Sequence, residues 1–312
     1  MADITRTEAL ALINQQDANE IWQAAPQFSA ALRTFRRVTM GTKQVRYPVI
    51  DALPTASFVA GEDATDDTSV KPTTAMAWDD RVLEAEEIGG IVVIPENVLD
   101  DAEFDIWGEI RPRIAEAVGV TLDAAVFFGT GSPASWPDGL VPAAITAGNE
   151  VAEGASGVDL AEDINMTLGE VEDDGYDPTV AYGRRSIRRR LRGLRDDQDA
   201  PIWSTSLSET GRVTNIYDST FEYVTNGAWV NADATLLVGD PNFAILGIRQ
   251  DITFKLLDQA SVTLGGTLIS LAERDLVGLR FKMRVGFQVA NTLTAEGGAD
   301  AYPFAVLTGG PS

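Results

Sequence analysis

The chain has 312 residues, 45% of them hydrophobic and 23% charged, which is enough to bury a substantial core as one large domain or two smaller ones. It contains no cysteine and no histidine, so zinc sites, disulfide bonds, thiol nucleophiles and imidazole bases are excluded. The formal net charge of -23 disfavours sequence-specific DNA binding, because affinity for a duplex comes mostly from cationic groups.

The same composition disfavours an enzyme and a membrane protein. We expect no catalytic site, no cofactor and no bound metal. A carboxylate-dependent enzyme such as a glycosidase is the alternative, although the spacing of the 47 acidic residues singles out no pair. No apolar run is long enough for a membrane span, and Asp3, Glu8 and Asp17 fall where a signal peptide needs an apolar core. We expect a soluble protein that stays in the cytosol where it is made.

The N-terminal part of the chain favours two helical pieces. Thr5 and Glu8 stand at capping-box spacing ahead of one apolar stripe, and Phe28, Leu32 and Phe35 fall at i, i+4 and i+7 in the next. An amphipathic helix on the protein's own core and an arm packed on a neighbouring subunit explain these stripes equally well.

The next segment predicts a long hairpin. Residues 43–60 alternate like a strand, residues 61–75 are acidic and polar, and extended character resumes from Met76 through Val82. An isolated two-stranded hairpin is marginally stable in water, so a surface outside this segment is expected to hold it. A flexible surface loop is the alternative interpretation.

A long helix is predicted from Asp100 or Asp101, either of which suits the N-cap, to Gly129, which suits the C-terminal stop. Its apolar residues recur every three or four positions, at Trp107, Ile110, Ile114, Val118, Leu122 and Val126. About 25 residues at 1.5 Å each give a length of about 40 Å. Pro112 lies within this range, so we expect a kink there or a helix that begins just before it.

A second helix is predicted from residue 160, with Asp159 as its N-cap and a stop near Gly175. A short strand at residues 179–182 leads into a basic run at residues 184–195, whose apolar members share one helical face. The candidate basic residues of this helix are Arg184, Arg185, Arg188, Arg189 and Arg192. A solvated face that pairs with the abundant acids is favoured, and contact with nucleic acid is the alternative.

Short strands are expected at residues 236–238, 244–246 and 252–254, and an unusually long one follows. Residues 277–289 alternate strictly between apolar and other side chains, which corresponds to about 43 Å at 3.3 Å per residue. A strand this long is typical of an elongated ribbon. Its second face carries cations, so we expect that face to be wet or to meet acidic neighbours.

Several segments, taken in order, resemble the major capsid proteins of tailed phages, whose fold was first described for phage Hong Kong 97 and is shared with encapsulins. One resembles the passage from an extended arm into the long spine helix of that family, and another its glycine-rich loop. A third resembles a strand pair, a fourth the long C-terminal strand and a fifth the terminal strand. The segments are residues 94–106, 123–131 with 137–140, 236–240 with 248–252, 273–287 and 301–307.

The resemblance implies an α+β protein with the Hong Kong 97-type capsid fold. The segments it implies are an N-terminal arm, an extended hairpin loop, a first peripheral part with the spine helix, an axial domain and a second peripheral part with the long strand. Their expected bounds are residues 1–42, 43–86, 87–144, 145–270 and 271–312.

The resemblance also implies a structural protein that assembles with itself into the pentamers and hexamers of an icosahedral virion shell enclosing double-stranded DNA. Assembly is expected in the host bacterial cytoplasm, with a portal protein, separate scaffolding and decoration proteins, non-specific contact with the packaged DNA and no membrane. An encapsulin-like nanocompartment is the alternative. Candidate contacts between subunits are Lys71, Arg81, Arg249, Arg280, Lys282 and Arg284.

Some members of the family crosslink themselves, joining a loop lysine to an asparagine with a glutamate as base. Lys71 suits the loop lysine, but Asp275 matches the asparagine and Lys282 matches the glutamate. Because a cation cannot act as the general base at neutral pH, we predict a shell without such crosslinks.

Overall fold

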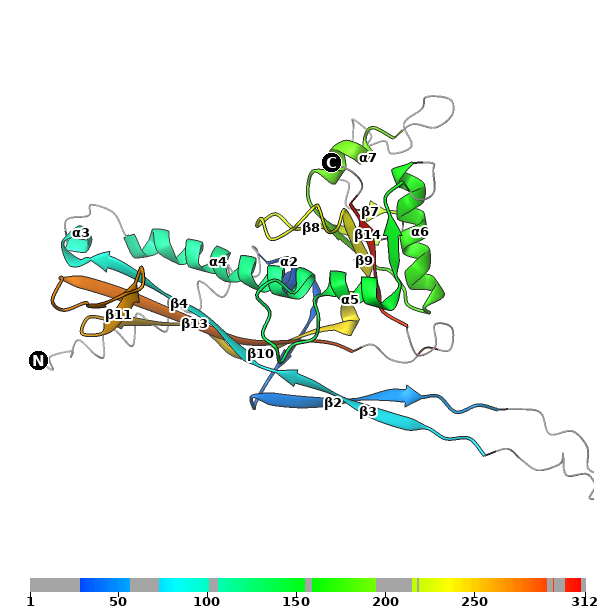
Figure 1. Ribbon diagram of the computed structural model, residues 1–312, viewed down its shortest axis with the longest axis horizontal. Coiled ribbons are helices and arrows are strands. Elements are labelled where there is room, and N and C mark those ends of the chain that lie inside the picture. The colour runs from blue at the N-terminus through cyan, green and yellow to red at the C-terminus, as the bar shows by residue number, and fades with distance from the viewer. Residues whose placement is uncertain are drawn as a thin grey trace, which may run out of the picture.

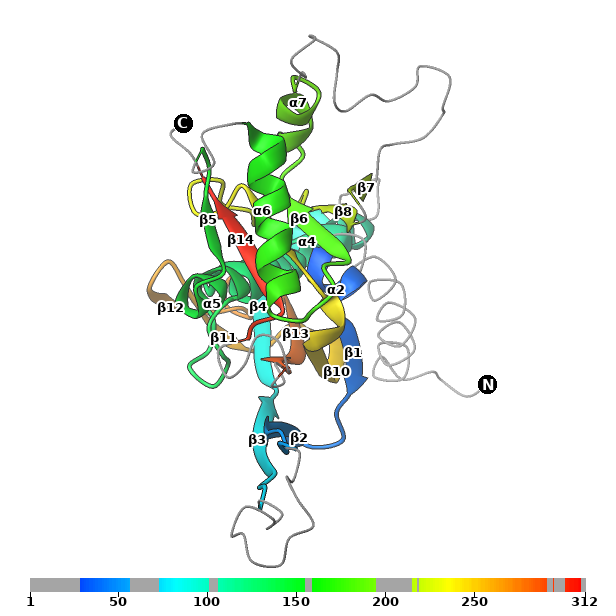
Figure 2. The same ribbon diagram turned by 90° about the vertical axis from the view of Figure 1, so that its right-hand side faces the viewer.

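The computed structural model describes residues 29–56, 73–100, 106–154, 159–194, 215–217, 219–290, 294 and 301–309. The expected first helix and Lys71 lie outside these residues. The described chain is elongated and has three parts: a long sheet with a long helix along it, a second sheet beside that helix's C-terminal end, and a projecting hairpin (Figures 1 and 2).

The helices and strands alternate irregularly along the chain. The helices are α2 (Ala30–Thr34), α3 (Glu96–Asp100), α4 (Ile106–Phe128), α5 (Leu140–Ala147), α6 (Leu160–Asp173) and α7 (Ile187–Leu191), with a 3-10 turn η2 (Pro241–Phe243). The first strands are β1 (Arg36–Thr39), β2 (Gln44–Ala52), β3 (Ala77–Glu84), β4 (Glu86–Pro95), β5 (Glu150–Ala152), β6 (Val180–Gly183) and β7 (Asn215–Ile216). The others are β8 (Ser219–Tyr223), β9 (Leu236–Gly239), β10 (Ala244–Leu257), β11 (Ser261–Leu264), β12 (Thr267–Ser270), β13 (Leu276–Val289) and β14 (Phe304–Thr308).

The long sheet has the strand order β1-β10-β13-β4. Strand β13 confirms the predicted long strand, and its apolar residues, among them Met283 and Phe287, pack against α4 in the main core. Strand β10 is one strand of 14 residues, whereas two short strands were expected. Its register against β13 shifts between Ile248 and Gln250 and again before Thr253. Such bulges insert extra residues, which breaks the alternation and hides the strand in the sequence.

The second sheet has the order β5-β14-β9-β6-β8-β7, and helix α6 packs on it through Ile164 and Leu168. Strand β14 confirms the expected terminal strand. The expected pairing of residues 236–240 with residues 248–252 is wrong, because β9 lies between β14 and β6 while β10 pairs with β1 and β13. Residues 236–240 are mostly apolar and residues 248–252 are mostly polar, and neither segment carries a pattern that specifies its partner strand.

Helix α4 (Ile106–Phe128) confirms the predicted long helix. Of the two expected N-cap residues, Asp100 is the last residue of α3, and Asp101 lies outside the described residues. Pro112 lies in the second turn of α4, where its missing N–H costs only one hydrogen bond close to the helix start. Gly129 ends the helix as expected, with a left-handed φ of 69° and its N–H bonded to the carbonyl of Ala125.

The expected boundary at residue 270 divides strands that pair in the structure. Strand β10 was assigned with the axial segment, yet it hydrogen-bonds to β13 along most of its length. The small hairpin of β11 and β12 packs at the far end of the same sheet, where Leu271 and Ile269 contact Leu257 and Leu276. The bound at residue 270 thus does not coincide with the edge of a sheet, and the division into peripheral and axial segments stays a prediction.

Candidate assembly surfaces

Strands β2 and β3 pair antiparallel and project beyond both sheets as the arm, which we define as residues 44–52 and 77–84 (Figure 1). The pairing confirms the predicted hairpin. Trp78 lies opposite Ile50 on the arm, and its side chain is 65% exposed. A large aromatic side chain exposed on a projecting ribbon is typical of a surface that another molecule covers.

The base of the arm packs on the long sheet, on the face turned away from α4. Leu83 and Met40 form a small buried cluster there with Ile245 of β10. Gly247 and Gly286 pair directly across β10 and β13, and their missing side chains leave the space for this cluster. We call these two glycines the glycine notch. The side chains that fill it attach the arm to the sheet, which matters because an isolated two-stranded hairpin is only marginally stable.

Polar contacts fix the base further. The indole N–H of Trp136 donates to the carbonyl of Glu84 at 3.1 Å, and the amide of Gln288 donates to the carbonyl of Val82 at 3.1 Å. Lys43 contacts the carboxylate of Glu84 at 2.7 Å. This hydrogen bond and its opposite charge lower the pKa of Glu84 and raise the pKa of Lys43. The loop after α4 thus clamps the arm onto the sheet.

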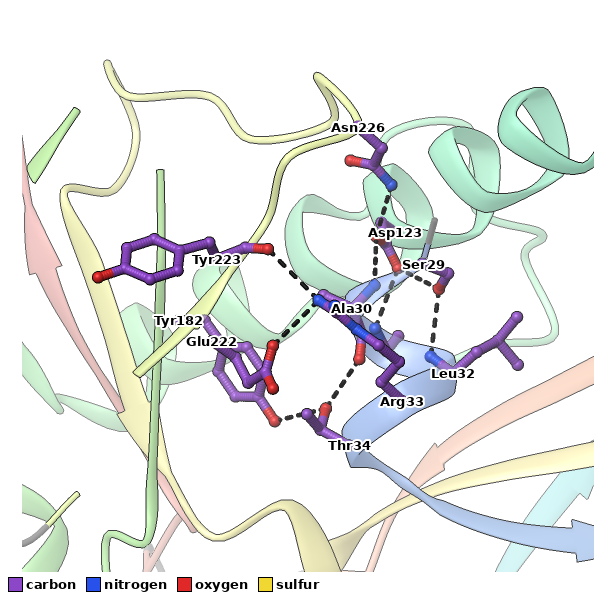
Figure 3. A network of polar contacts seen from close by, with 11 residues as sticks. Ser29, Ala30, Leu32, Arg33, Thr34, Asp123, Tyr182, Glu222, Tyr223 and Asn226 are labelled. Carbon is purple, nitrogen blue, oxygen red and sulfur yellow. Dashed lines mark hydrogen bonds and ion pairs between the residues drawn. The ribbon is translucent and has the colours of Figure 1, made fainter. Parts of the chain in front are cut away.

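A buried carboxylate joins the N-terminal side of the described chain to the long helix (Figure 3). Asp123 of α4 is fully buried and accepts hydrogen bonds from the hydroxyl of Ser29 at 2.6 Å and from the backbone N–H groups of Ala30 at 2.9 Å and Ala31 at 3.2 Å. The side chain of Asn226 donates to it at 2.7 Å. Burial raises the pKa of Asp123, and these four hydrogen bonds oppose that effect.

Helix α2 also contacts the second sheet. The hydroxyl of Tyr182 on β6 donates to Thr34 at 2.8 Å, and Arg33 forms an ion pair with Glu222 on β8 at 3.0 Å (Figure 3). Strand β1 follows directly and pairs parallel with β10. Residues 29–39 therefore tie the long helix, the second sheet and the long sheet together.

The candidate contact residues do not form one site. Arg81 lies on the arm with its guanidinium 3.9 Å from Asp79, and Arg249 is exposed at a bulge of β10. Arg280, Lys282 and Arg284 do lie together, on the face of β13 that carries the glycine notch. Lys255 of β10, which the sequence did not single out, lies directly opposite Arg280.

The basic helix is shorter than expected, since α7 spans five residues, with Ile187 and Leu191 buried. Arg190 forms a bidentate ion pair with Glu153, and the guanidinium of Arg188 lies 5.4 Å from the ring centre of Tyr223. The side chain of Arg192 donates to the carbonyl of Arg188, and Arg189 is exposed.

Arg184 and Arg185 line an open pocket of about 160 Å³ with Trp229 at its wall. Glu153 thus neutralises Arg190, and the role of the five candidate residues of the basic helix stays a prediction.

The two described positions that match the crosslinking residues carry opposite charges and lie in different parts of the chain. Asp275 has a left-handed φ of 50° in the turn before β13, and its carbonyl accepts a hydrogen bond from the N–H of Glu96. Lys282 lies seven residues later on the cationic face. Among the described residues, no group of three or more acids could hold a metal ion, and no described helix is long and apolar enough to cross a membrane.

Some assembly-related residues were missed in the sequence. Asp123 sits next to Leu122 on the predicted apolar stripe, and an acid in such a position is the signal of a buried hydrogen-bonded carboxylate. Gly286 interrupts the polar face of the long strand, which is a sign of close approach by another segment.

An elongated shape with an aromatic side chain exposed on a projecting arm (Figure 1) is typical of a protein that assembles with other chains. A sequence model of the phage capsid family matches residues 10–294. The major capsid protein of Staphylococcus phage 80alpha is 25% identical over 230 residues, which cover 70% of this chain and 65% of that protein.

Solved structures agree with this match. A chain from Microbacterium phage Oxtober96 is 44% identical with a TM-score of 0.82, and the alignment covers 99% of this chain and 100% of that one. A chain from Mycobacterium phage Cain is 35% identical with a TM-score of 0.82, and 100% of each chain is covered. The chain belongs to the phage capsid family and is a major capsid protein of a tailed phage, a non-enzymatic component of the virion capsid. Capsid assembly means that it associates with copies of itself.

Proposed function

We propose that this chain forms the pentamers and hexamers of an icosahedral shell around double-stranded DNA, and that each arm lies across a neighbouring copy. The exposed arm is the observation that carries the proposal. Its two strands project beyond both sheets, and Trp78 remains 65% exposed there. A surface of this kind is covered when identical subunits close a symmetric assembly.

Each of the three parts of the chain would have its own place in the shell. The long sheet with α4 would form the peripheral part, and the sheet with α6 the axial part around each capsomer centre. Asp123 of α4 links these two parts, because it accepts a hydrogen bond from Asn226 in the loop after β8. A subunit with a rigid body and a projecting arm suits repeated contacts in closed rings.

The acidic surface suits a container for DNA. With a net charge of -23, the chain repels phosphates in general, so any contact with packaged DNA is weak and non-specific. Separate scaffolding and decoration proteins and a portal protein would complete the particle. The phage origin of the matched proteins favours DNA as cargo over the enzyme cargo of an encapsulin.

Electron microscopy of the expressed protein at high concentration tests the proposal. We expect closed shells with pentameric and hexameric capsomers. A chain that remains a compact monomer under all concentrations and salt conditions would contradict it. Nucleic acid extracted from particles made during infection separates the phage shell from the encapsulin alternative.

A further inference from the structure

A pocket opens at one edge of the second sheet, where two parallel strands end side by side. Strands β6 and β8 pair parallel as far as Gly183 and Tyr223, so the residues that follow the two strands meet at the same edge. Arg184 and Arg185 directly follow β6, residues of the loop 224–229 follow β8, and together they line an opening of about 160 Å³. Open α/β sheets bind their ligands at the carboxyl ends of parallel strands.

The loop side of this pocket is held in place by its own chain. The indole N–H of Trp229 donates to the carbonyl of Ala234 at 2.8 Å, and the ring belongs to the main core. The side chain of Asn226 donates to the buried carboxylate of Asp123 (Figure 3). The same side chain accepts a hydrogen bond from the N–H of Ala228 at 3.1 Å. Because these contacts fix the loop, a ligand does not have to order this wall when it binds.

The other side of the pocket supplies positive charge. The side chains of Arg184 and Arg185 are exposed, and within the part of the chain that the structure describes no ion pair involves either of them. Arg190 of the same basic run differs, because it is paired with Glu153. Each guanidinium carries five N–H donors in a fixed fork. Two such forks at one opening match the several oxygens of a phosphate group.

The size and the wall of the pocket limit the ligand further. The opening is about ten times as large as a cavity that holds one water molecule, so it has room for more than an inorganic ion. Val224 and Trp229 line it with apolar side chains that are otherwise buried. An apolar wall strengthens charge interactions beside it and suits the sugar or base of a nucleotide.

We propose that this pocket is a phosphate-binding site, in which Arg184 and Arg185 hold the phosphate group of a nucleotide and the apolar wall contacts its sugar or base. A free nucleotide and a nucleotide within a DNA strand carry the same group, and the test separates these two sources. The net charge of -23 disfavours phosphates over the chain as a whole, so this pair of arginines sets the place where one binds. The pocket is lined by a single chain, so the site does not depend on shell assembly.

Isothermal titration calorimetry with the full-length, unassembled chain tests the site. The probes are inorganic phosphate, deoxyadenosine monophosphate and a short DNA duplex, with sodium glutamate as a carboxylate for comparison. The pocket variant carries Arg184→Ala and Arg185→Ala. The matched control carries Arg113→Ala and Arg189→Ala, which removes two exposed arginines outside the pocket and changes the net charge by the same amount. Circular dichroism and thermal unfolding check that both variants are folded.

The wild type is expected to bind the mononucleotide more tightly than inorganic phosphate, and both more tightly than glutamate. The pocket variant should bind the mononucleotide more weakly on the order of tenfold, because it lacks the charge-assisted hydrogen bonds. The control should change this affinity by less than about twofold, since salt screens charges outside the pocket. A variant with Arg184→Lys and Arg185→Lys keeps both charges but loses the planar forks, and its affinity should lie in between.

The DNA probe identifies the source of the phosphate. If the duplex loses affinity in the pocket variant and not in the control, the site takes a phosphate of DNA; if only the mononucleotide does, it takes a free nucleotide. Equal losses in the pocket variant and the control would show binding to net charge and overturn the site. Glutamate bound as tightly as the mononucleotide, a mononucleotide bound no better than inorganic phosphate, or a wild type that binds no probe would also overturn the proposal.

Discussion

Gly247 and Gly286 pair directly across strands β10 and β13, and the space that their missing side chains leave is filled by Leu83 at the base of the arm. A Cβ on Gly286 would lie 2.6 Å from the backbone oxygen of Glu84, so any larger residue must displace the arm. The direction in which the arm projects thus depends on the absence of a Cβ atom at both glycines.

Gly286→Ala is therefore expected to destabilise the monomer by about 1–3 kcal/mol, the usual cost of overpacking. Thermal unfolding measures the loss, and limited proteolysis should show faster cleavage within the arm. Gly169→Ala is the matched control, since a Cβ there meets no atom and Ala favours the interior of α6 by up to about 1 kcal/mol. If the wild type and Gly286→Ala were equally stable and were cleaved equally fast, the claim that Gly286 makes room for the base of the arm would be contradicted.

Asp123→Ala is expected to lower the free energy of unfolding by about 3 kcal/mol, because it leaves buried donors from Ser29, Ala30 and Asn226 without an acceptor. Denaturant unfolding gives the value. Asp173→Ala, at the exposed end of α6, is the control and should change stability by less than about 0.5 kcal/mol. A double-mutant cycle with Ser29→Ala should reveal coupling, and strict additivity would argue against the network.

The carboxyl of Glu84 is expected to titrate below its ordinary pKa of 4.5, because Lys43 and Gln44 hydrogen-bond to its charged form. Its contribution to stability is then present above pH 4.5 and is lost as the pH falls through the lowered pKa of the folded state. An NMR titration measures the midpoint. Lys43→Met should move it toward 4.5 without reaching it, since the hydrogen bond from Gln44 remains; an unmoved midpoint would contradict the assignment.

Trp78→Ala is expected to impair assembly while leaving the monomer as stable as the wild type, because this side chain is already exposed in the isolated chain. Analytical ultracentrifugation measures the shift toward unassembled protein, and thermal unfolding checks the fold. Trp78→Phe keeps an aromatic ring at the same position and should retain most of the assembly. Normal shells from Trp78→Ala would remove this residue from the subunit contact.

Purified shells are expected to run as a single monomer band on a denaturing gel. The position matched to the crosslinking base is Lys282, and a protonated lysine cannot accept the proton that isopeptide formation releases. Lys71→Ala serves as the comparison, since it removes the matched loop lysine. A ladder of covalent multimers that disappears in Lys71→Ala would overturn this prediction.

The periodicity of apolar residues in the sequence is sufficient to predict the longest helix and the long C-terminal strand of this protein. The alternation over residues 277–289 predicted β13, and the apolar stripe from Trp107 to Val126 predicted α4. Such signals are strong because burial of one face constrains every second or every third to fourth residue. The family resemblance followed from the order of these segments and not from any single residue.

Only the tertiary structure decided which strands pair and where the cations gather. Strand β9 was expected beside residues 248–252, yet its neighbours are β14 and β6, because short apolar strands carry no mark of their partners. Lys255 and Arg280 are 25 positions apart and meet only through the register of β10 and β13. The place of Asp123 beside the apolar stripe indicates a buried acid, but only the fold brings Ser29 and Asn226 to its carboxylate. Local patterns fix elements, whereas contacts between distant residues depend on the packing of the whole chain.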